Sequence, residues 1–200
     1  MSQEEKVTTD ANSKRQYRYC GKVFGHPYFL NLCDQFPEVD AVYKSFIDYW
    51  RNGLHPAFGR DRVFNRPEVA REYHIRHVHV DVKDYKQEND SDYTSRESHW
   101  DAWKNMIAAN DPAAEQLLPR SYFRAPTSDA FLVYSVNEYR DAIVLDFIQA
   151  DAHRLSERTD LTDFYTQEVF KYTINNGIKP FHTDGQPFDE KHLNNNQNPS

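Results

Sequence analysis

The chain has 200 residues, a formal net charge of −7 with histidine neutral, and an aromatic content of 14%. This length suffices for one domain with a hydrophobic core, while the acidic balance argues against a protein that binds nucleic acid through its overall charge. No apolar run approaches the ~20 residues that cross a bilayer, and the first residues lack the apolar stretch of a secretory signal. We therefore expect a cytoplasmic protein without a membrane partner, in which Cys20 and Cys33 are reduced thiols.

Both ends of the chain are polar and carry no helix or strand pattern. We expect residues 1–21 to form a disordered N-terminal arm and residues 177–200 to form a disordered C-terminal tail. The domain then spans residues 22–176, interrupted by a long polar stretch over residues 83–127 that we interpret as an insertion. A short helix within this insertion is marked by Trp100, Trp103 and Ile107.

Two amphipathic helices are predicted. Pro37 suits the first position of the first helix, and Gly53 suits its left-handed C-cap. A second helix is expected over residues 161–172, with Asp160 as N-cap and Gly177 as its stop. The first helix has apolar residues at a 3.6-residue period, namely Val39, Val42, Tyr43, Phe46, Ile47, Trp50 and Leu54.

The remaining apolar segments are predicted to be strands. Residues 29–32 look like a short first strand, and residues 72–82 alternate between apolar and polar side chains. Residues 130–136 and 142–149 are two β-rich runs separated by a connection of hairpin length. The order of these elements predicts an α+β domain: a small twisted antiparallel sheet with helices packed on one face.

Several segments, taken together, resemble the YafO family of toxins from type II toxin–antitoxin systems. They occur in order within residues 22–172 and read KSFIDYWRNG, LHP, FGRD, IRHVHV, FLVY and DAHRL. The resemblance implies a compact RelE-like fold and an endonuclease that cleaves translated mRNA on the ribosome. It also implies a cognate antitoxin as partner, in a toxin–antitoxin hetero-oligomer. The two tails and the long 83–127 segment depart from the family pattern.

Cleavage of RNA by its own 2′-hydroxyl needs a base, an acid and a cation beside the phosphate, but no metal or other cofactor. Histidine suits the first two roles and arginine the third. His77 and His79 share a strand face by the period-two rule, although polar residues on an exposed face explain this pattern equally well. His153 follows the last strand. Arg60 lies in a predicted tight turn, where it suits a phosphate clamp or a salt bridge to Asp61. The candidate catalytic residues are therefore His77, His79, His153 and Arg60.

Four further residues are candidates for RNA binding: Arg76, Tyr134, Arg154 and Arg158. Tyr134 alternates with Leu132 and Val136, which also fits a buried core tyrosine. Arg154 equally fits a solvated residue at the start of a helix.

Two other classes of function stay open. His79 and Asp81, followed by His153 or His182, contain the residue types of a two-histidine, one-carboxylate iron site, and His77 with His79 resembles cupin metal spacing. The predicted strands are too few for a cupin barrel. The acidic balance also fits a protein that acts by binding alone.

Overall fold

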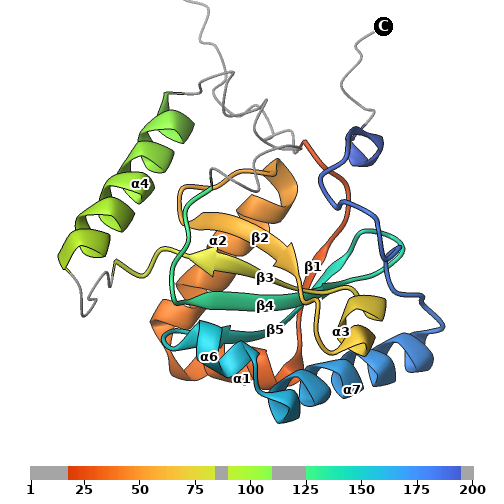
Figure 1. Ribbon diagram of the computed structural model, residues 1–200. Helices are drawn as coiled ribbons and strands as arrows, with labels where there is room; N and C mark the ends of the chain where they lie inside the picture. Colours follow the sequence, from red (N-terminus) through yellow and green to blue (C-terminus); the bar gives the residue numbers. More distant parts are fainter. Residues whose placement is uncertain (1–17, 84–89, 110–124, 195–200) are drawn as a thin grey trace, which may run out of the picture.

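The computed structural model describes residues 18–83, 90–109 and 125–194. Its centre is a five-stranded sheet with the order β1-β5-β4-β3-β2 (Figure 1). The strands are β1 Val23–Gly25, β2 Phe58–Val63, β3 Ile75–Val80, β4 Phe131–Val136 and β5 Ala142–Ile148. Neighbouring strands from β2 to β5 pair antiparallel, whereas β1 pairs parallel to β5. The expected α+β class is confirmed, with a mixed sheet in place of a purely antiparallel one.

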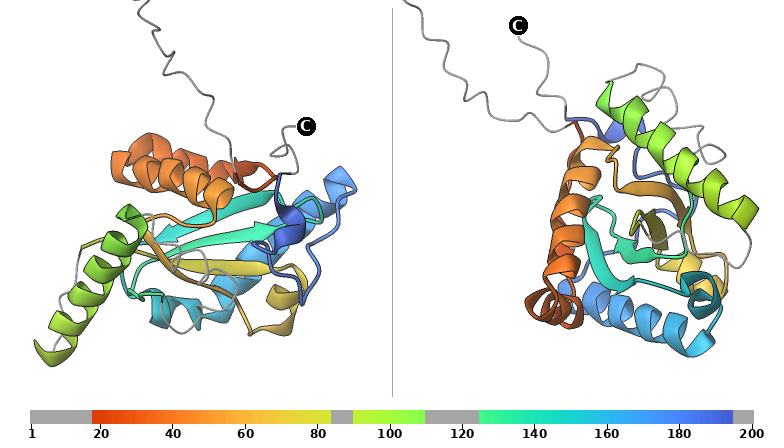
Figure 2. Two further views of the ribbon diagram at one scale, coloured as in Figure 1. Left: turned by 90° about the horizontal axis from the view of Figure 1, so that it is seen from above. Right: turned by 90° about the vertical axis from the view of Figure 1, so that its left-hand side faces the viewer.

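Helices cover both faces of this sheet, not one face as expected. The helices of one layer are α1 Pro27–Gln35 and α2 Pro37–Asn52, and those of the other are α3 Glu68–Glu72, α6 Ala152–Ser156 and α7 Thr159–Asn176. The left view of Figure 2 shows the sheet between the two layers. Sequence periodicity identified the amphipathic helices but could not say on which side of the sheet each one would pack. None of the helices within the described ranges is long and apolar enough to cross a membrane.

The two expected amphipathic helices are present, and the expected strand at residues 29–32 is not. Helix α2 begins at Pro37 and ends at Gly53, whose φ of 81° is the left-handed C-cap. Residues 29–32 lie instead in α1, which begins at Pro27 and whose N-cap His26 accepts a hydrogen bond from the amide of Tyr28. A four-residue run with three apolar side chains does not distinguish a strand from one buried helical turn. The proline at the first position and the cap at His26 favour the helix.

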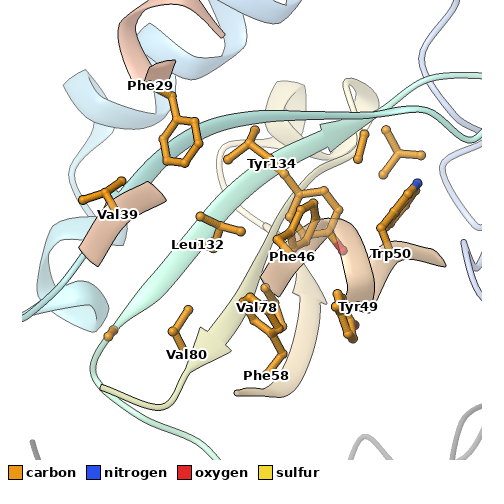
Figure 3. Close-up of a cluster of buried hydrophobic side chains, with 14 of the residues drawn as sticks. Phe29, Val39, Phe46, Tyr49, Trp50, Phe58, Val78, Val80, Leu132 and Tyr134 are labelled. Atoms are coloured by element: carbon orange, nitrogen blue, oxygen red, sulfur yellow. The ribbon is translucent and has the colours of Figure 1, made fainter. Parts of the chain in front are cut away.

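Side chains alternate between two cores because strand residues point to opposite faces. Phe29, Phe46 and Trp50 from α1 and α2 pack on Val78 and Leu132 of the sheet (Figure 3). On the other face, Ile75, Phe131, Val133, Tyr165 and Val169 form the second core with α7. His77 and His79 share the strand parity of Ile75, so they project on the α6 and α7 side.

Residues 18–21 and 177–194 do not behave as the expected free arm and tail. Tyr19 pairs with Leu193 in a short antiparallel bridge, and Phe181 is buried in the first core. The buried guanidinium of Arg140 donates to the carbonyl oxygens of Cys20, Trp50 and Pro187. The polar composition of the tail concealed these contacts, because they are made mainly by backbone carbonyls. The rest of both expected tails lies outside the described residues.

Part of the expected 83–127 insertion is described, and it contains helix α4, Asp90–Ala108. Figure 2 shows α4 as an arm beside the sheet. Its C-terminal half is docked by Trp100 and Trp103, which form a small third core with Ala125. Trp103 Nε1 donates to the carbonyl oxygen of Phe58 in β2 at 2.9 Å. The two tryptophans are therefore core residues.

Candidate active site

Three histidines from two elements meet around one phenylalanine ring. The imidazole of His77 stacks on Phe131 with ring centroids 4.3 Å apart, and the imidazole of His79 lies 4.6 Å from the same ring. His153, at the start of α6, approaches Phe131 to 4.9 Å and His79 to 5.5 Å. The structure therefore brings His153 together with His77 and His79, which lie far from it in the sequence.

Strand geometry explains this convergence. His77 and His79 lie two residues apart on β3, and His79 pairs directly with Phe131 on β4. After β5, Asp151 adopts a left-handed backbone conformation with φ of 56° and turns the chain into α6. The amide of His153 then donates to Oδ1 of Asp129 at 3.0 Å, which anchors the start of α6 beside β4.

The ring of His79 is buried, with 2% of its surface exposed. Its Nδ1 atom lies 2.7 Å from the carbonyl oxygen of Ser128 and 2.9 Å from the amide nitrogen of the same residue. Burial, followed by the neighbouring His77, lowers the pKa of His79 to about 3; His153 and Arg60 act in the same direction, and the hydrogen bond with Ser128 opposes them. His79 is thus neutral at pH 7, with Nδ1 held by the backbone.

His77 is also held neutral. Its ring lies between Phe131 and Phe64, and its Nδ1 atom is buried without a hydrogen-bond partner among the described residues. Burial lowers the pKa of His77 to about 3, followed in size by the charges of Arg76, His153 and Arg62. An unpaired buried nitrogen is costly in a purely structural role, so this atom is a candidate for a ligand contact.

Two arginines of β2 border the histidines. Arg62 pairs with His77 across the β2–β3 ladder, and Arg60 lies two residues earlier on the same strand. Burial and the charge of Arg62 lower the pKa of Arg60. Within the described ranges neither arginine has an acidic partner, and Nε of Arg60 is buried without a hydrogen bond. Two neighbouring guanidinium groups without counter-ions form a site suited to a phosphate.

A family model described as "Toxin YafO, type II toxin-antitoxin system" matches residues 43–173. The chain belongs to the YafO toxin family. It is therefore the toxin of a type II toxin–antitoxin pair, and the family implies a cognate antitoxin as its partner. No curated protein and no solved structure matches the chain.

The matched span of this YafO-family toxin begins inside α2 and ends inside α7. It contains strands β2 to β5 and all of the residues described above around Phe131. Strand β1, helix α1 and residues 174–194 lie outside the matched span, although they pack against the same sheet. The segments that suggested the family in the sequence fall largely within this span.

Two predicted RNA-binding residues of the toxin lie on the opposite face of the sheet. Arg76 is 1% exposed and Tyr134 is fully buried. Nε of Arg76 donates to Oδ1 of Asp61 at 3.0 Å and to the hydroxyl of Tyr134 at 3.1 Å. Their strand parity, opposite to that of His77 and His79, puts them under α2, where RNA cannot reach them in this conformation.

The other two predicted RNA-binding residues are exposed but already paired. Arg154 donates to Asp151 at 2.8 Å, and Arg158 donates to Asp160 at 3.0 Å. Asp160 lies inside α7 and pairs with Arg158, two residues earlier, and Arg158 occupies the N-cap position expected for Asp160. Arg154 follows His153 directly and is the nearer of the two arginines to the histidines in sequence.

Sequence reasoning did not identify Arg62, Ser128 or Asp129 as part of this site. Arg62 could have been predicted from the sequence, because it lies two residues from Arg60 and so shares its face of the strand. Ser128 and Asp129 contribute a backbone carbonyl and a backbone-binding carboxylate at the start of β4. No side-chain pattern marks a carbonyl oxygen, so this contribution required the fold.

The metal-site alternative gains no support from the described residues. Among them, no group of three histidine, cysteine, aspartate or glutamate side chains could hold a metal ion. Asp81, the carboxylate of that alternative, instead pairs with Lys104 of α4 at 2.5 Å.

Proposed function

We propose that this toxin is a metal-independent endoribonuclease that cleaves translated mRNA in association with the ribosome and thereby inhibits protein synthesis. The observation that carries the proposal is the convergence of His77, His79 and His153 beside Arg60 and Arg62 on one face of the sheet. Membership of the family supports the toxin role, and the side chains at this site support the proposed endoribonuclease reaction.

The proposed reaction uses the RNA 2′-hydroxyl as nucleophile. An imidazole removes the 2′-hydroxyl proton while O2′ forms a bond to phosphorus and the bond from phosphorus to O5′ breaks. A second imidazole gives a proton to the departing O5′, which leaves a 2′,3′-cyclic phosphate and a 5′-hydroxyl. Arg60 stabilises the charge on the non-bridging oxygens, because its guanidinium stays protonated and binds phosphate in a fork.

The electrostatics separate the histidines into two kinds. His77 and His79 are neutral at pH 7, so they suit the base, which must begin without a proton. His153 is the exposed member of the group, and we assign it the role of the acid. A bound phosphate would oppose the positive field of the arginines and raise the lowered pKa values of His77 and His79 toward neutrality.

The charge of the chain favours delivery of RNA by the ribosome. A net charge of −7 repels the phosphate backbone at long range. The basic residues near the histidines are few, and Arg154 and Arg158 are already paired with acids. A message held on the ribosome removes the need for the toxin to attract free RNA.

Expression without the antitoxin tests the proposal. Induction of the wild-type toxin should stop growth, lower protein synthesis and produce breaks in ribosome-bound message with cyclic phosphate ends. Naked RNA of the same sequence should be cut far more slowly at physiological salt. Normal growth under strong induction would overturn the toxin's proposed action, and equal cleavage of naked RNA would remove the ribosome from the proposal.

A second candidate is a toxin that acts by binding alone. The near-complete burial of His79 favours it, because a substrate reaches that ring only after a local rearrangement. The same assay separates the two: growth inhibition that persists without RNA breaks, and that survives replacement of all three histidines, would favour binding.

A further inference from the structure

A short segment between the end of the α4 insertion and β4 contacts three of the proposed catalytic residues. The carbonyl of Pro126 accepts from the amide of Arg60 at 2.9 Å. Two residues later, Ser128 contacts Nδ1 of His79 at 2.7 Å through its carbonyl oxygen. Asp129 then accepts from the amide of His153 at 3.0 Å. Consecutive residues thus connect β2, β3 and α6 at the site.

The carbonyl of Thr127 connects this segment to α4. Trp100 is fully buried, and its Nε1 donates to the carbonyl oxygen of Thr127 at 3.2 Å. The segment lies directly on β2: a β-carbon at Gly59 would collide with the carbonyl oxygen of Pro126 and would crowd the Trp100 ring. We therefore expect a change at Trp100 to displace residues 126–129, because Trp100 binds Thr127 directly and the segment packs closely on β2.

We propose that residues 126–129, held in place by Trp100 of α4, are the positioning element of the site, and that the Ser128 carbonyl fixes His79 with the proton on Nδ1 and the lone pair on Nε2. The catalytic consequence, that Nε2 of His79 is the base, rests on the proposed endoribonuclease function. The positioning of His79 by residues 126–129 does not depend on that function, because it is a property of the protein without RNA.

The tautomer follows from the two contacts at Nδ1. A neutral imidazole satisfies either the carbonyl or the amide of Ser128, but not both. If Nδ1 carries no proton, its lone pair faces a lone pair of the Ser128 carbonyl oxygen at 2.7 Å. If Nδ1 carries the proton, its N–H group faces the amide N–H of Ser128 at the longer distance of 2.9 Å. Because the contact to the carbonyl oxygen is the shorter one, the repulsion between lone pairs would be the larger, and we infer that Nδ1 carries the proton and donates it to this oxygen. No described residue then bonds Nε2, which leaves this atom available to a substrate.

The α4 arm provides a matched pair of variants. Trp100 and Trp103 both donate an indole N–H to a backbone carbonyl, and both belong to the same small core. Only the acceptor of Trp100 lies in residues 126–129, whereas the acceptor of Trp103 is Phe58 in β2. Trp100→Phe and Trp103→Phe therefore remove similar bonds and similar apolar area, but only the first acts on the positioning segment.

The test is the nitrogen-15 NMR spectrum of the imidazoles in the full chain, with the His79 signals identified by their loss in His79→Asn. We expect wild-type His79 to show a protonated Nδ1 and an unprotonated Nε2 at pH 7. Trp100→Phe should shift the tautomer ratio of His79, while Trp103→Phe should leave it unchanged. An unprotonated Nδ1 in the wild type, or equal shifts in the two variants, would overturn the proposal.

A kinetic measurement adds the functional side. On ribosome-bound message, Trp100→Phe should lower kcat about tenfold with little change in KM, as loss of an outer contact to a catalytic imidazole does elsewhere. Trp103→Phe should retain wild-type kcat. Because the spectra are recorded without RNA, they decide the positioning alone, and failure of the wild-type toxin to cleave would count only against the proposed function.

Discussion

Nε of Arg76 lies 3.0 Å from Oδ1 of Asp61, and this pair is buried on the face of the sheet opposite to the three histidines. Oδ2 of the same carboxylate accepts from the hydroxyls of Tyr49 and Tyr134. Asp61 thus satisfies three donors beneath α2. Strand alternation gives β2 a divided role: Asp61 stabilises the first core, while Arg60 and Arg62 face the proposed active site.

Replacement of Asp61 by alanine should destabilise the toxin strongly. The change removes Asp61 as the acidic partner of the buried Arg76 guanidinium and as the acceptor of two tyrosine hydroxyls. Loss of one partner of a buried pair typically costs about 3–5 kcal/mol. Urea unfolding followed by circular dichroism measures this cost. The control is Lys44→Ala, which removes an exposed pair with Asp40 and should cost no more than about 0.5 kcal/mol. Equal effects of the two variants would contradict the assigned role of Asp61.

Single replacement of the histidines should separate catalysis from folding. We expect His77→Ala, His79→Ala or His153→Ala to retain the fold, and at least one to lower cleavage of ribosome-bound message by about 10²–10⁴-fold, the usual size of an acid–base contribution. Rates of message cleavage and circular dichroism spectra provide the two readouts. His182→Ala, an exposed histidine that the proposed site does not include, should cleave at the wild-type rate. Wild-type rates in all three variants would remove these residues from the site.

Much of the fold was predictable because it depends on local patterns. The helix from Pro37 to Gly53 has a clear start, stop and apolar face, and the pair of strands at residues 130–136 and 142–149 was visible as two apolar runs. Residues 29–32 form a helical turn and not the expected strand, because three apolar residues within four positions have no distinctive period. The parallel pairing of β1 depends on contacts over more than a hundred residues, which a local pattern does not encode.

The candidate site was predictable only in part. Alternation placed His77 and His79 on one face, and the fold adds His153 by packing α6 beside β4. The same alternation, applied to Arg76 and Tyr134, would have assigned them to the other face. The Ser128 carbonyl was invisible in the sequence, because every residue type carries the same backbone atoms.

Arg60 offers a test of phosphate recognition. Arg60→Lys keeps the charge but loses the planar fork, and Arg60→Ala loses both. If Arg60 contacts the phosphate in the transition state, both variants should lower kcat/KM on ribosome-bound message. We expect Arg60→Ala to lose about 10²–10³-fold, the size seen for removal of one transition-state donor, and Arg60→Lys to lose less. Arg71→Ala, at an exposed arginine paired with Asp184 and outside the proposed site, serves as the charge-matched control. A loss in this control equal to that in Arg60→Ala would point to a general charge effect.

The buried histidines make the stability of the toxin depend on pH. Burial lowers the pKa of His74, His77 and His79 to about 3, below the 6.5 of an exposed histidine. Between these values the unfolded chain binds more protons, so stability should be full above about pH 6.5 and should fall as the pH is lowered toward 3. Each group contributes a slope of up to about 1.4 kcal/mol per pH unit.

His74→Asn isolates one of these groups. Asparagine tolerates the positive φ of 48° at this position and does not titrate in this range. We expect the slope of unfolding free energy between about pH 4 and pH 6 to fall by roughly one proton equivalent relative to wild type. Urea unfolding at a series of pH values measures it. An unchanged slope would mean that His74 is protonated in the folded toxin.

The docking of the chain ends can be tested at two glycines. Gly21 and Gly177 both have positive φ, of 93° and 62°. A β-carbon at Gly21 would collide with the carbonyl oxygen of Arg140, whereas a β-carbon at Gly177 meets nothing within 4 Å. Gly177→Ala should therefore cost only the backbone penalty of about 1–2 kcal/mol. Gly21→Ala should cost more in urea unfolding, because it also displaces residues 18–22 from Arg140.

Hydrogen exchange locates that extra cost. The amide of Cys20 donates to the carbonyl of His192, so Gly21→Ala should raise exchange at Cys20 and in residues 186–193, while Gly177→Ala should leave both unchanged. Equal costs for the two variants, together with unchanged exchange at Cys20, would show that residues 18–22 are not held against Arg140 in solution. The expected difference reflects a steric conflict of one added methyl group with a backbone atom that buried Arg140 holds in place.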